Sequence, residues 1–392
     1  MPRERTSNTI GRRRFLVAAA ALACLPKTAR AATTQTSSDG FFTLGQENGR
    51  WWFLTPERRP FFSLALNHID STPLRGAESI SIWRDKYRNS TREWLERAVR
   101  HDLLDWGFNS VGWVQEVVTR QPTSHRHSRN FVYEEYQWLD LPYCHMLPFA
   151  DFHQWEQETK NPDFFSVGFE EWCDYVARSE CSRFAGDPKL IGYFYIDCPT
   201  WVHIREFNQW KGPLFDPEKL STEAGRAELK RLASRYYQVT HDAIRRYDPH
   251  HLILGDRYEM NAPLPAEVVE AAAPYVDVLS FQDFAPVERI RADLAHWHET
   301  SGKPVLLADS AGSLNAAGGV VRHDADKYAA TLAALRENPG AVGFHLCGAY
   351  LRNQARKRGL RDDHERPDEQ VIAAIHAANR ETQAWADRAG KL

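Results

Sequence analysis

A chain of 392 residues is long enough for one large domain or two domains of medium size. Hydrophobic residues make up 43% of it and charged residues 26%, as in an ordinary globular protein, and a net charge of −3 gives no reason to expect nucleic acid or an anionic membrane as a partner. The 13 Trp, 14 Tyr and 20 Phe are unusually many, and such rings form flat apolar surfaces for sugars as well as core.

The N-terminal segment has the three parts of an export signal in order. A twin-arginine motif spans Gly11–Leu16, an apolar stretch runs from Phe15 to Leu25, and Ala29-Arg30-Ala31 offers a small-x-small cleavage site. The apolar stretch is too short to span a bilayer as a mature helix. We therefore expect residues 1–31 to be a twin-arginine signal peptide and residues 38–392 the mature domain. The protein would be periplasmic or secreted, with no membrane contact after cleavage.

The cysteines give no sign of a disulfide framework or a metal motif. Cleavage after Ala31 leaves an odd number of them, so they cannot all be paired, and their spacing matches no zinc or redox motif. We expect most of them to be small buried apolar groups. The five are Cys144, Cys173, Cys181, Cys198 and Cys347.

From Phe41 onward, short β-branched or aromatic runs alternate with amphipathic stretches, which is typical of βα units around a parallel sheet. Eight strands are expected, at Phe61–Asn67, Ser110–Val114, Cys144–Pro148, Leu190–Ile196, Leu252–Gly255, Val276–Phe281, Pro304–Ala308 and Ala341–Leu346. Helices are expected at about Thr91–Trp106, Glu170–Phe184, Ala224–Tyr247, Ala266–Ala273, Val287–Thr300 and His323–Glu337. Loops are expected at Arg120–Trp138 and Pro199–Pro217. The pattern predicts the α/β class and a single (β/α)8 TIM barrel.

In such barrels the active site lies at the C-terminal ends of the strands. Polar and aromatic side chains follow the predicted strands, and we expect them to form a sugar site. The residues expected to hold sugar hydroxyls are Asn67, His68, Asp70, Gln115, Arg257, Gln282, His345 and Tyr350. Those expected to stack on sugar rings are Trp113, Trp201 and Trp210.

Carboxylates after the fourth and seventh strands are the strongest chemical signal. Asp197 and Asp309 hold these two positions, which face each other across the mouth of a barrel. One can act as acid/base and the other as nucleophile or base in glycosidic cleavage. Retention needs carboxyls about 5–5.5 Å apart, and inversion needs about 6.5–9.5 Å. The alternative interpretation is that both residues are helix caps or salt-bridge partners.

Several segments together resemble those of agarase-like glycoside hydrolases. They are Trp51–Glu57, Pro60–Leu64, Asp277–Phe281, Gly302–Leu307 and Gly343–His345. The resemblance covers most of the mature chain. It implies a TIM barrel of the retaining-glycosidase type, with its acids after strands four and seven, and a substrate that is a β-linked galactose-type polysaccharide or oligosaccharide.

The chain departs from this family at the two positions that matter most. The fourth strand of the family is expected to end in Asn-Glu, where this chain has Asp197-Cys198, and a nucleophilic Glu is expected where Asp309 stands. Because Asp is one methylene shorter, each carboxyl would be withdrawn by roughly 1.5 Å, toward the separation of inverting enzymes. Cys198 cannot be an ordinary general acid, since a free thiol has a pKa of about 8.5. Glu116 and Asp256 are the reserve acids.

Two other functions stay open. A metal-dependent barrel hydrolase could use His68 and Asp70 as a first-strand metal pair. Such sites normally take further His or Cys ligands from several strands, so we expect no metal and no cofactor. A non-catalytic carbohydrate-binding barrel would keep the rim aromatics and lack both expected glutamates. The choices between retention and inversion and between endo and exo action stay open, as does the oligomeric state.

Overall fold

A computed structural model describes residues 40–121, 124–150, 163–199, 201–202, 216–261, 263–316, 320–353 and 357–389. The expected signal peptide lies outside these residues. Within them, no helix has both the length and the apolar character that a membrane crossing requires. The five cysteines among these residues are buried thiols, as expected for small apolar groups.

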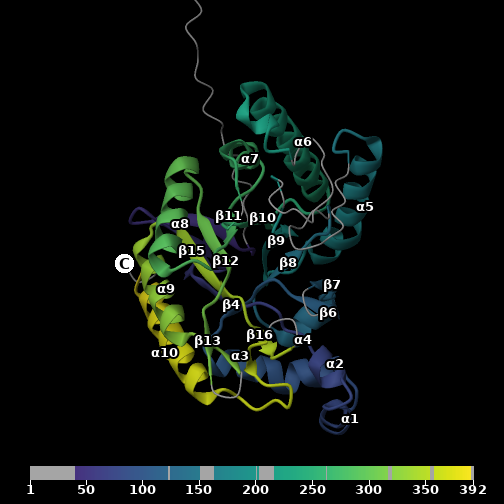
Figure 1. The fold of residues 1–392 in the computed structure, drawn as a ribbon, viewed down its shortest axis with the longest axis vertical. Helices are drawn as coiled ribbons and strands as arrows, with labels where there is room; N and C mark the ends of the chain where they lie inside the picture. The colour runs from purple at the N-terminus through teal and green to yellow at the C-terminus, as the bar shows by residue number, and fades with distance from the viewer. Residues whose placement is uncertain are drawn as a thin grey trace, which may run out of the picture. The chain divides into compact units, whose positions relative to one another are not determined.

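Eight parallel strands close into a barrel in the order β10-β11-β12-β15-β4-β5-β8-β9 (Figure 1). This confirms the predicted (β/α)8 barrel and all eight predicted strands, since each strand overlaps its predicted run, although β10 continues past the predicted end at Gly255 to Glu259. The strands are β4 (Ser63–Leu66), β5 (Ser110–Val111), β8 (Tyr143–Met146), β9 (Leu190–Asp197), β10 (Leu252–Glu259), β11 (Leu279–Gln282), β12 (Val305–Ser310) and β15 (Ala341–Leu346).

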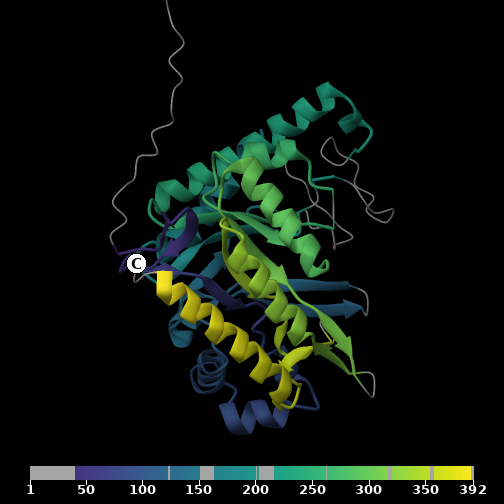
Figure 2. The same ribbon diagram turned by 90° about the vertical axis from the view of Figure 1, so that its left-hand side faces the viewer.

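Helices surround the barrel at every predicted position. They are α2 (Thr91–Trp94) continued by η2 (Leu95–Val99) and α3 (Arg100–Asp105), then α5 (Val167–Phe184), α6 (Glu223–Tyr247), α7 (Ala266–Ala272), α8 (Val287–Ser301) and α9 (Ala325–Glu337). Further helices are η1 (Thr72–Arg75), α1 (Ile80–Tyr87), α4 (Tyr133–Leu139), η4 (Lys219–Ser221) and α10 (Glu369–Ala389). Figure 2 shows α10, in yellow, lying along α9.

The helix ends follow from local sequence. The side chains of Ser166, Thr222 and Asp324 each accept a hydrogen bond from a backbone N–H three residues later, which caps α5, α6 and α9. Gly302 ends α8 with a φ of 68°, a left-handed conformation that glycine adopts without steric cost. The three N-caps fix where these helices begin, and Gly302 turns the chain from α8 toward the next strand.

A small antiparallel sheet closes one end of the barrel. It consists of β1 (Thr43–Glu47), β2 (Arg50–Leu54) and β3 (Pro60–Phe61). Phe42 and Phe53 belong to the apolar cluster inside the barrel, together with Ile191, Leu306 and other strand residues. Arg50 donates to the carbonyl of Ala341, the first residue of β15, so this sheet lies at the N-terminal end of the barrel. The open end is therefore the one where the strands finish.

Within the described residues, three two-stranded sheets lie outside the barrel. They are β6 (Gln115–Gln121) with β7 (Ser124–Asn130), β13 (Ser313–Asn315) with β14 (Val321–His323), and β16 (Ala349–Leu351) with β17 (Gly359–Arg361). The prediction of a loop over Arg120–Trp138 was wrong, because this region holds the end of β6, all of β7 and most of α4. Its polar sequence lacks the apolar alternation by which a strand is recognised. Most of the second predicted loop lies outside the described residues.

A bulge at Gly255 decides which side chains of β10 face the barrel interior. The pairing of β10 with β9 shifts on both sides of Gly255, whose φ is 66°. Because strand side chains alternate between faces, one extra residue reverses the alternation beyond it. Leu254 belongs to the interior cluster, and after the bulge Arg257 and Glu259 reach the mouth of the barrel while Asp256 faces outward.

Replacing Gly255 with alanine is expected to lower the free energy of unfolding by about 2–4 kcal/mol. The new Cβ would need the left-handed conformation and would lie 2.9 Å from Val276 Cγ1. Gly302→Ala is the matched control, since Gly302 has a similar φ of 68° with no atom within 4 Å of the added carbon. It should cost only about 1 kcal/mol. Urea unfolding measures the change in unfolding free energy of both variants. Equal losses in the two would show that the close contact with Val276 is not what makes Gly255 necessary.

Candidate active site

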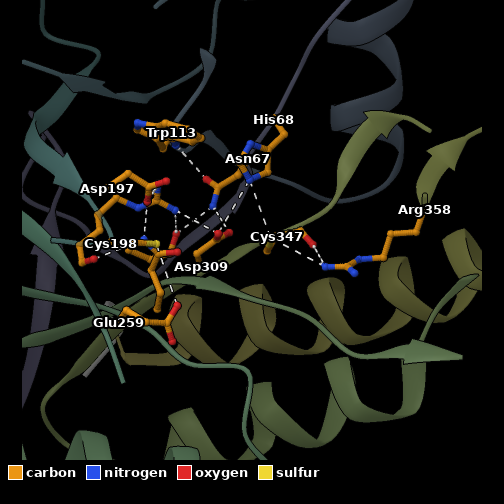
Figure 3. Close-up of polar contacts among 12 residues, drawn as sticks. Asn67, His68, Trp113, Asp197, Cys198, Glu259, Asp309, Cys347 and Arg358 are labelled. Carbon is orange, nitrogen blue, oxygen red and sulfur yellow. Dashed lines mark hydrogen bonds and ion pairs between the residues drawn. The ribbon is translucent and has the colours of Figure 1, made fainter. Parts of the chain in front are cut away.

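Asp309 lies near the end of β12, in the mouth of the barrel, and its carboxylate is held firmly. Asn67, which directly follows β4, donates through Nδ2 to Asp309 Oδ1 at 2.6 Å and to the carbonyl of Ala308 at 2.8 Å. Asn67 is itself fixed, because its Oδ1 accepts from the backbone N–H of Trp113 at 2.8 Å. The Asp309 carboxylate therefore has one defined orientation (Figure 3).

The guanidinium of Arg257 lies between the two carboxylates predicted to be catalytic. Its Nη1 donates to Asp197 Oδ1 at 3.0 Å, and its Nη2 lies 3.4 Å from Asp309 Oδ2. The Arg257 side chain is fully buried over the ring of Trp113, with Cζ 4.8 Å from the ring centroid. Two acids with side chains only 9% and 5% exposed are costly to bury as anions, and this cation offsets that cost.

Gln282 completes this group from β11. Its Nε2 donates to Asp197 Oδ1 and, at 3.3 Å, to the backbone carbonyl of Arg257. The side chains of Asn67, Arg257 and Gln282 are thus engaged with the acids, and each residue is at most 2% exposed. The structure gives these three residues the task of orienting the carboxylates, where the sequence had suggested direct contact with sugar hydroxyls.

Two residues beside this group have strained backbones. His68, which follows Asn67, has a φ of 54°, and Cys198, which follows Asp197, has a φ of 45°. The left-handed conformation is uncommon outside glycine and costs about 1–3 kcal/mol for each such residue. Strain of this kind often occurs at functional sites, and here it lies next to both Asn67 and Asp197.

Three possible metal ligands, His68, Asp309 and Cys347, also meet here. His68 Nε2 is 3.8 Å from Asp309 Oδ2 and 3.8 Å from Cys347 Sγ, a donor set that suits zinc. Positive charge already lies against two of the three, because Arg257 Nη2 is 3.4 Å from Asp309 Oδ2 and Arg358 Nη2 is 3.9 Å from Cys347 Sγ. Two guanidinium groups at this distance disfavour a divalent cation.

Asp256, one of the reserve acids, does not face the mouth, so that prediction was wrong. Its carboxylate accepts from the hydroxyls of Tyr236 at 3.0 Å and Tyr237 at 2.6 Å, both on the barrel side of α6. Burial raises the pKa of Asp256 to about 7. The bulge at Gly255 is the physical reason, since without it this side chain would point inward.

Two aromatic residues predicted to bind sugar lie in the core between strands and helices. Trp201 is 1% exposed and stacks on Tyr237 of α6, with 5.9 Å between ring centroids. Tyr350 is fully buried and donates its hydroxyl hydrogen bond to Asp102 on α3. The predicted sugar contacts of both residues were wrong, because position after a strand does not fix the direction of a side chain.

His345 and Asp70 also have local structural partners. His345 is fully buried inside the barrel, where its Nε2 lies 2.9 Å from Ser63 Oγ. Burial lowers the pKa of His345 to about 3, with the positive charge of Arg257 adding to the effect, so the imidazole is neutral. Asp70 accepts from the backbone N–H of Thr72 at 2.9 Å and from its hydroxyl at 2.7 Å, which fixes the start of η1. Neither residue is placed to meet a sugar.

The side chains of three predicted site residues lie outside the part of the chain that the structure describes. Trp210 lies outside the described residues. Gln115 and Glu116 begin β6, and their backbone is described while their side chains are not.

The structure adds one acid that the sequence analysis missed. Glu259 ends β10, is 3% exposed, and places Oε2 4.0 Å from the thiol of Cys198. The fifth strand was predicted to stop at Gly255, because a glycine inside a strand reads as its end. Once Arg257 is assigned to the mouth, strand alternation puts the residue two positions later on the same face, and that signal could have identified Glu259.

Comparisons with known proteins agree on the fold. No family model and no curated protein matches this sequence. Among solved structures, the chain is similar to an agarase, with 17% identity, a TM-score of 0.65, and coverage of 88% of this chain and 64% of that one. It is also similar to an exo-β-agarase, with 16% identity, a TM-score of 0.67, and coverage of 88% and 66%.

A β-glucuronidase of Bacteroides uniformis matches less completely, with 14% identity, a TM-score of 0.56, and coverage of 87% of this chain and 37% of that one. The chain thus spans about two thirds or less of these three proteins. At such identities the likeness concerns the fold. The resemblance to agarase-like barrels that the sequence suggested is confirmed at that level.

Proposed function

We propose that this chain is an exported glycoside hydrolase that cleaves a β-linked galactose-type polysaccharide or oligosaccharide by two-carboxylate catalysis. The observation that carries the proposal is the pair Asp197 and Asp309, brought to the mouth of the barrel around one buried arginine. The agarases among the similar structures support the sugar class. The twin-arginine motif and cleavage site in residues 1–31 support export.

Asp309 is suited to be the nucleophile or base. Its Oδ1 accepts from Asn67, while its Oδ2 lies near Arg257 and His68, so the group is fixed and its charge is balanced. An ionised carboxylate in such a setting can attack the anomeric carbon or remove a proton from an attacking water. A second carboxyl, in its protonated form, must then donate to the oxygen of the departing sugar.

The experiment that tests this function is turnover of a polysaccharide panel, with agarose and sulfated galactans included. The purified mature chain should release new reducing ends from at least one galactan. A carbohydrate-binding barrel would instead be retarded in a gel that contains the polymer and release no reducing ends. That second result would overturn the proposed activity and leave binding as the function.

Removing divalent metals is expected to leave turnover unchanged within about twofold, since the positive charges of Arg257 and Arg358 lie against two of the candidate ligands and disfavour a divalent cation. The mature chain is dialysed against a chelator and assayed on the responding polymer, with and without added zinc. A tenfold loss that zinc restores would show that His68, Asp309 and Cys347 hold a metal. The metal-dependent hydrolase would then replace the two-carboxylate mechanism.

A further inference from the structure

Cys198 occupies the position where an agarase-like barrel is expected to carry its acid/base glutamate. A thiol cannot take over that task, and the neighbouring Asp197 is already engaged. Asp197 Oδ1 accepts from Arg257 and from Gln282, both of which are pure donors at these atoms. Asp197 is therefore held as the ion-pair partner of Arg257, a role that differs from giving a proton.

Glu259 brings a carboxyl to this position from the adjacent strand. β10 pairs with β9 in the barrel, and Glu259 Oε2 lies 4.0 Å from Cys198 Sγ (Figure 3). The other oxygen, Oε1, accepts from the backbone N–H of Asn261 at 3.1 Å and from its side-chain amide at 2.8 Å. Oε1 is thereby an acceptor, while Oε2 accepts a long, weak contact from the Cys198 thiol. When the carboxyl is protonated, Oε2 is the oxygen that carries the proton, and the sulfur is then the acceptor.

The electrostatic setting favours that protonated form. Burial, opposed by the hydrogen bonds from Asn261 and helped by the negative charges of Asp197 and Asp309, raises the pKa of Glu259 to about 7. Neither of the neighbouring side chains adds positive charge to the Glu259 carboxyl. They are Cys198, which follows β9, and Gln282 on β11, which pairs in register with Glu259. A carboxylic acid that is still protonated near neutral pH is what general acid catalysis requires.

We propose that Glu259 is the general acid of this barrel, delivered by the fifth strand to the place that Cys198 leaves vacant on the fourth. The inference rests on the proposed glycosidase function. The Oε2 proton passes to the glycosidic oxygen as its bond to the anomeric carbon breaks. On one route Asp309 takes the anomeric carbon as an ester, which water then breaks as it gives its proton back to Glu259. On the other route Asp309 removes the proton of the attacking water and passes it to solvent, and solvent reprotonates Glu259. Overall, one water supplies the hydroxyl on the anomeric carbon and the proton on the departing sugar.

The test compares Glu259→Gln with the wild type on two substrates. Glutamine keeps the shape of the protonated acid and has no proton to give, so cleavage of the responding galactan should fall by about 10²–10⁴-fold. A dinitrophenyl β-galactoside has a leaving group that needs no proton, so its release in the first turnover, before any ester is hydrolysed, should slow by no more than about threefold. Glu365→Gln is the matched control, because Glu365 is also buried, at 7% exposure, and contacts Lys86 and Tyr87 on α1.

The pH profile gives a second readout. Wild-type turnover should decline as pH rises through about 7, where Glu259 loses its proton, and this limb should be absent from the residual activity of Glu259→Gln. Equal losses on both substrates, or full turnover of the galactan, would overturn Glu259 as the acid while leaving the proposed function in place. If the wild type itself cleaves no polymer, the proposed function fails first and this inference falls with it.

Discussion

Replacing Asp309 with asparagine is expected to lower turnover of the responding galactan by about 10⁴-fold or more, which is the usual effect of removing a nucleophile or base. The amide has nearly the same shape, so it can keep a contact with Asn67. It can neither attack the anomeric carbon nor accept a proton. The variant also loses its charge beside Arg257, so its free energy of unfolding should fall by about 1–3 kcal/mol.

Asp256→Asn is the control for this variant. Asp256 is as deeply buried as Asp309. Because burial raises the pKa of Asp256 to about 7, its carboxyl is partly protonated near neutral pH, and asparagine resembles that protonated form. Its turnover per folded molecule should stay within about threefold of the wild type, since its carboxyl contacts α6 and not the mouth. Equal turnover by the wild type and Asp309→Asn would remove Asp309 from the mechanism.

Replacing Arg257 with methionine is expected to cost about 3–5 kcal/mol of folding stability and at least about 100-fold in turnover. The change leaves Asp197 and Asp309 close together in a buried site without their shared cation. It also frees both carboxylates to move, and catalysis is sensitive to small displacements of the reacting groups. The loss of stability should be smaller at acid pH, because protonated carboxyls need no counter-ion.

Urea unfolding and the reducing-end assay measure the two effects, with Arg361→Met as the control. Arg361 forms a similar two-pronged pair with Asp102, at 2.6 and 2.7 Å, outside the mouth. That variant should lose stability while its turnover per folded molecule is kept. The double variant Arg257→Met/Asp197→Asn should be more stable than Arg257→Met alone, since one unpaired charge is gone. Additive losses would show that Arg257 is not the counter-ion of Asp197.

The fold could be predicted from the sequence because each barrel strand is a short, continuous apolar run between polar helices. The run from Leu190 to Ile196 and the run from Ala341 to Leu346 are strands over almost the same residues in the structure. Buried parallel strands produce this signal directly, and the rule that sites lie at their C-terminal ends located the mouth. Asp197, Asp309 and Arg257 followed from that rule.

The incorrect predictions concern the direction in which a side chain points. The order of residues at the end of a strand does not encode that direction. A single bulge at Gly255 sends Asp256 outward and Glu259 inward. Trp201 stacks on α6, whose contact with it is set by tertiary packing. The strained conformations of His68 and Cys198 likewise arise from the surrounding structure and carry no local sequence signature.

The most direct test of the account is the mass of the oligosaccharides that the wild type releases from agarose in water enriched in heavy oxygen. Hydrolysis by two carboxylates places one solvent oxygen on the anomeric carbon at each new reducing end, so every product that has a new reducing end should carry one heavy atom there. Products with an unsaturated end and no heavy oxygen would show elimination. Retention of the polymer without any product would show a binding protein, and either result would contradict a glycoside hydrolase.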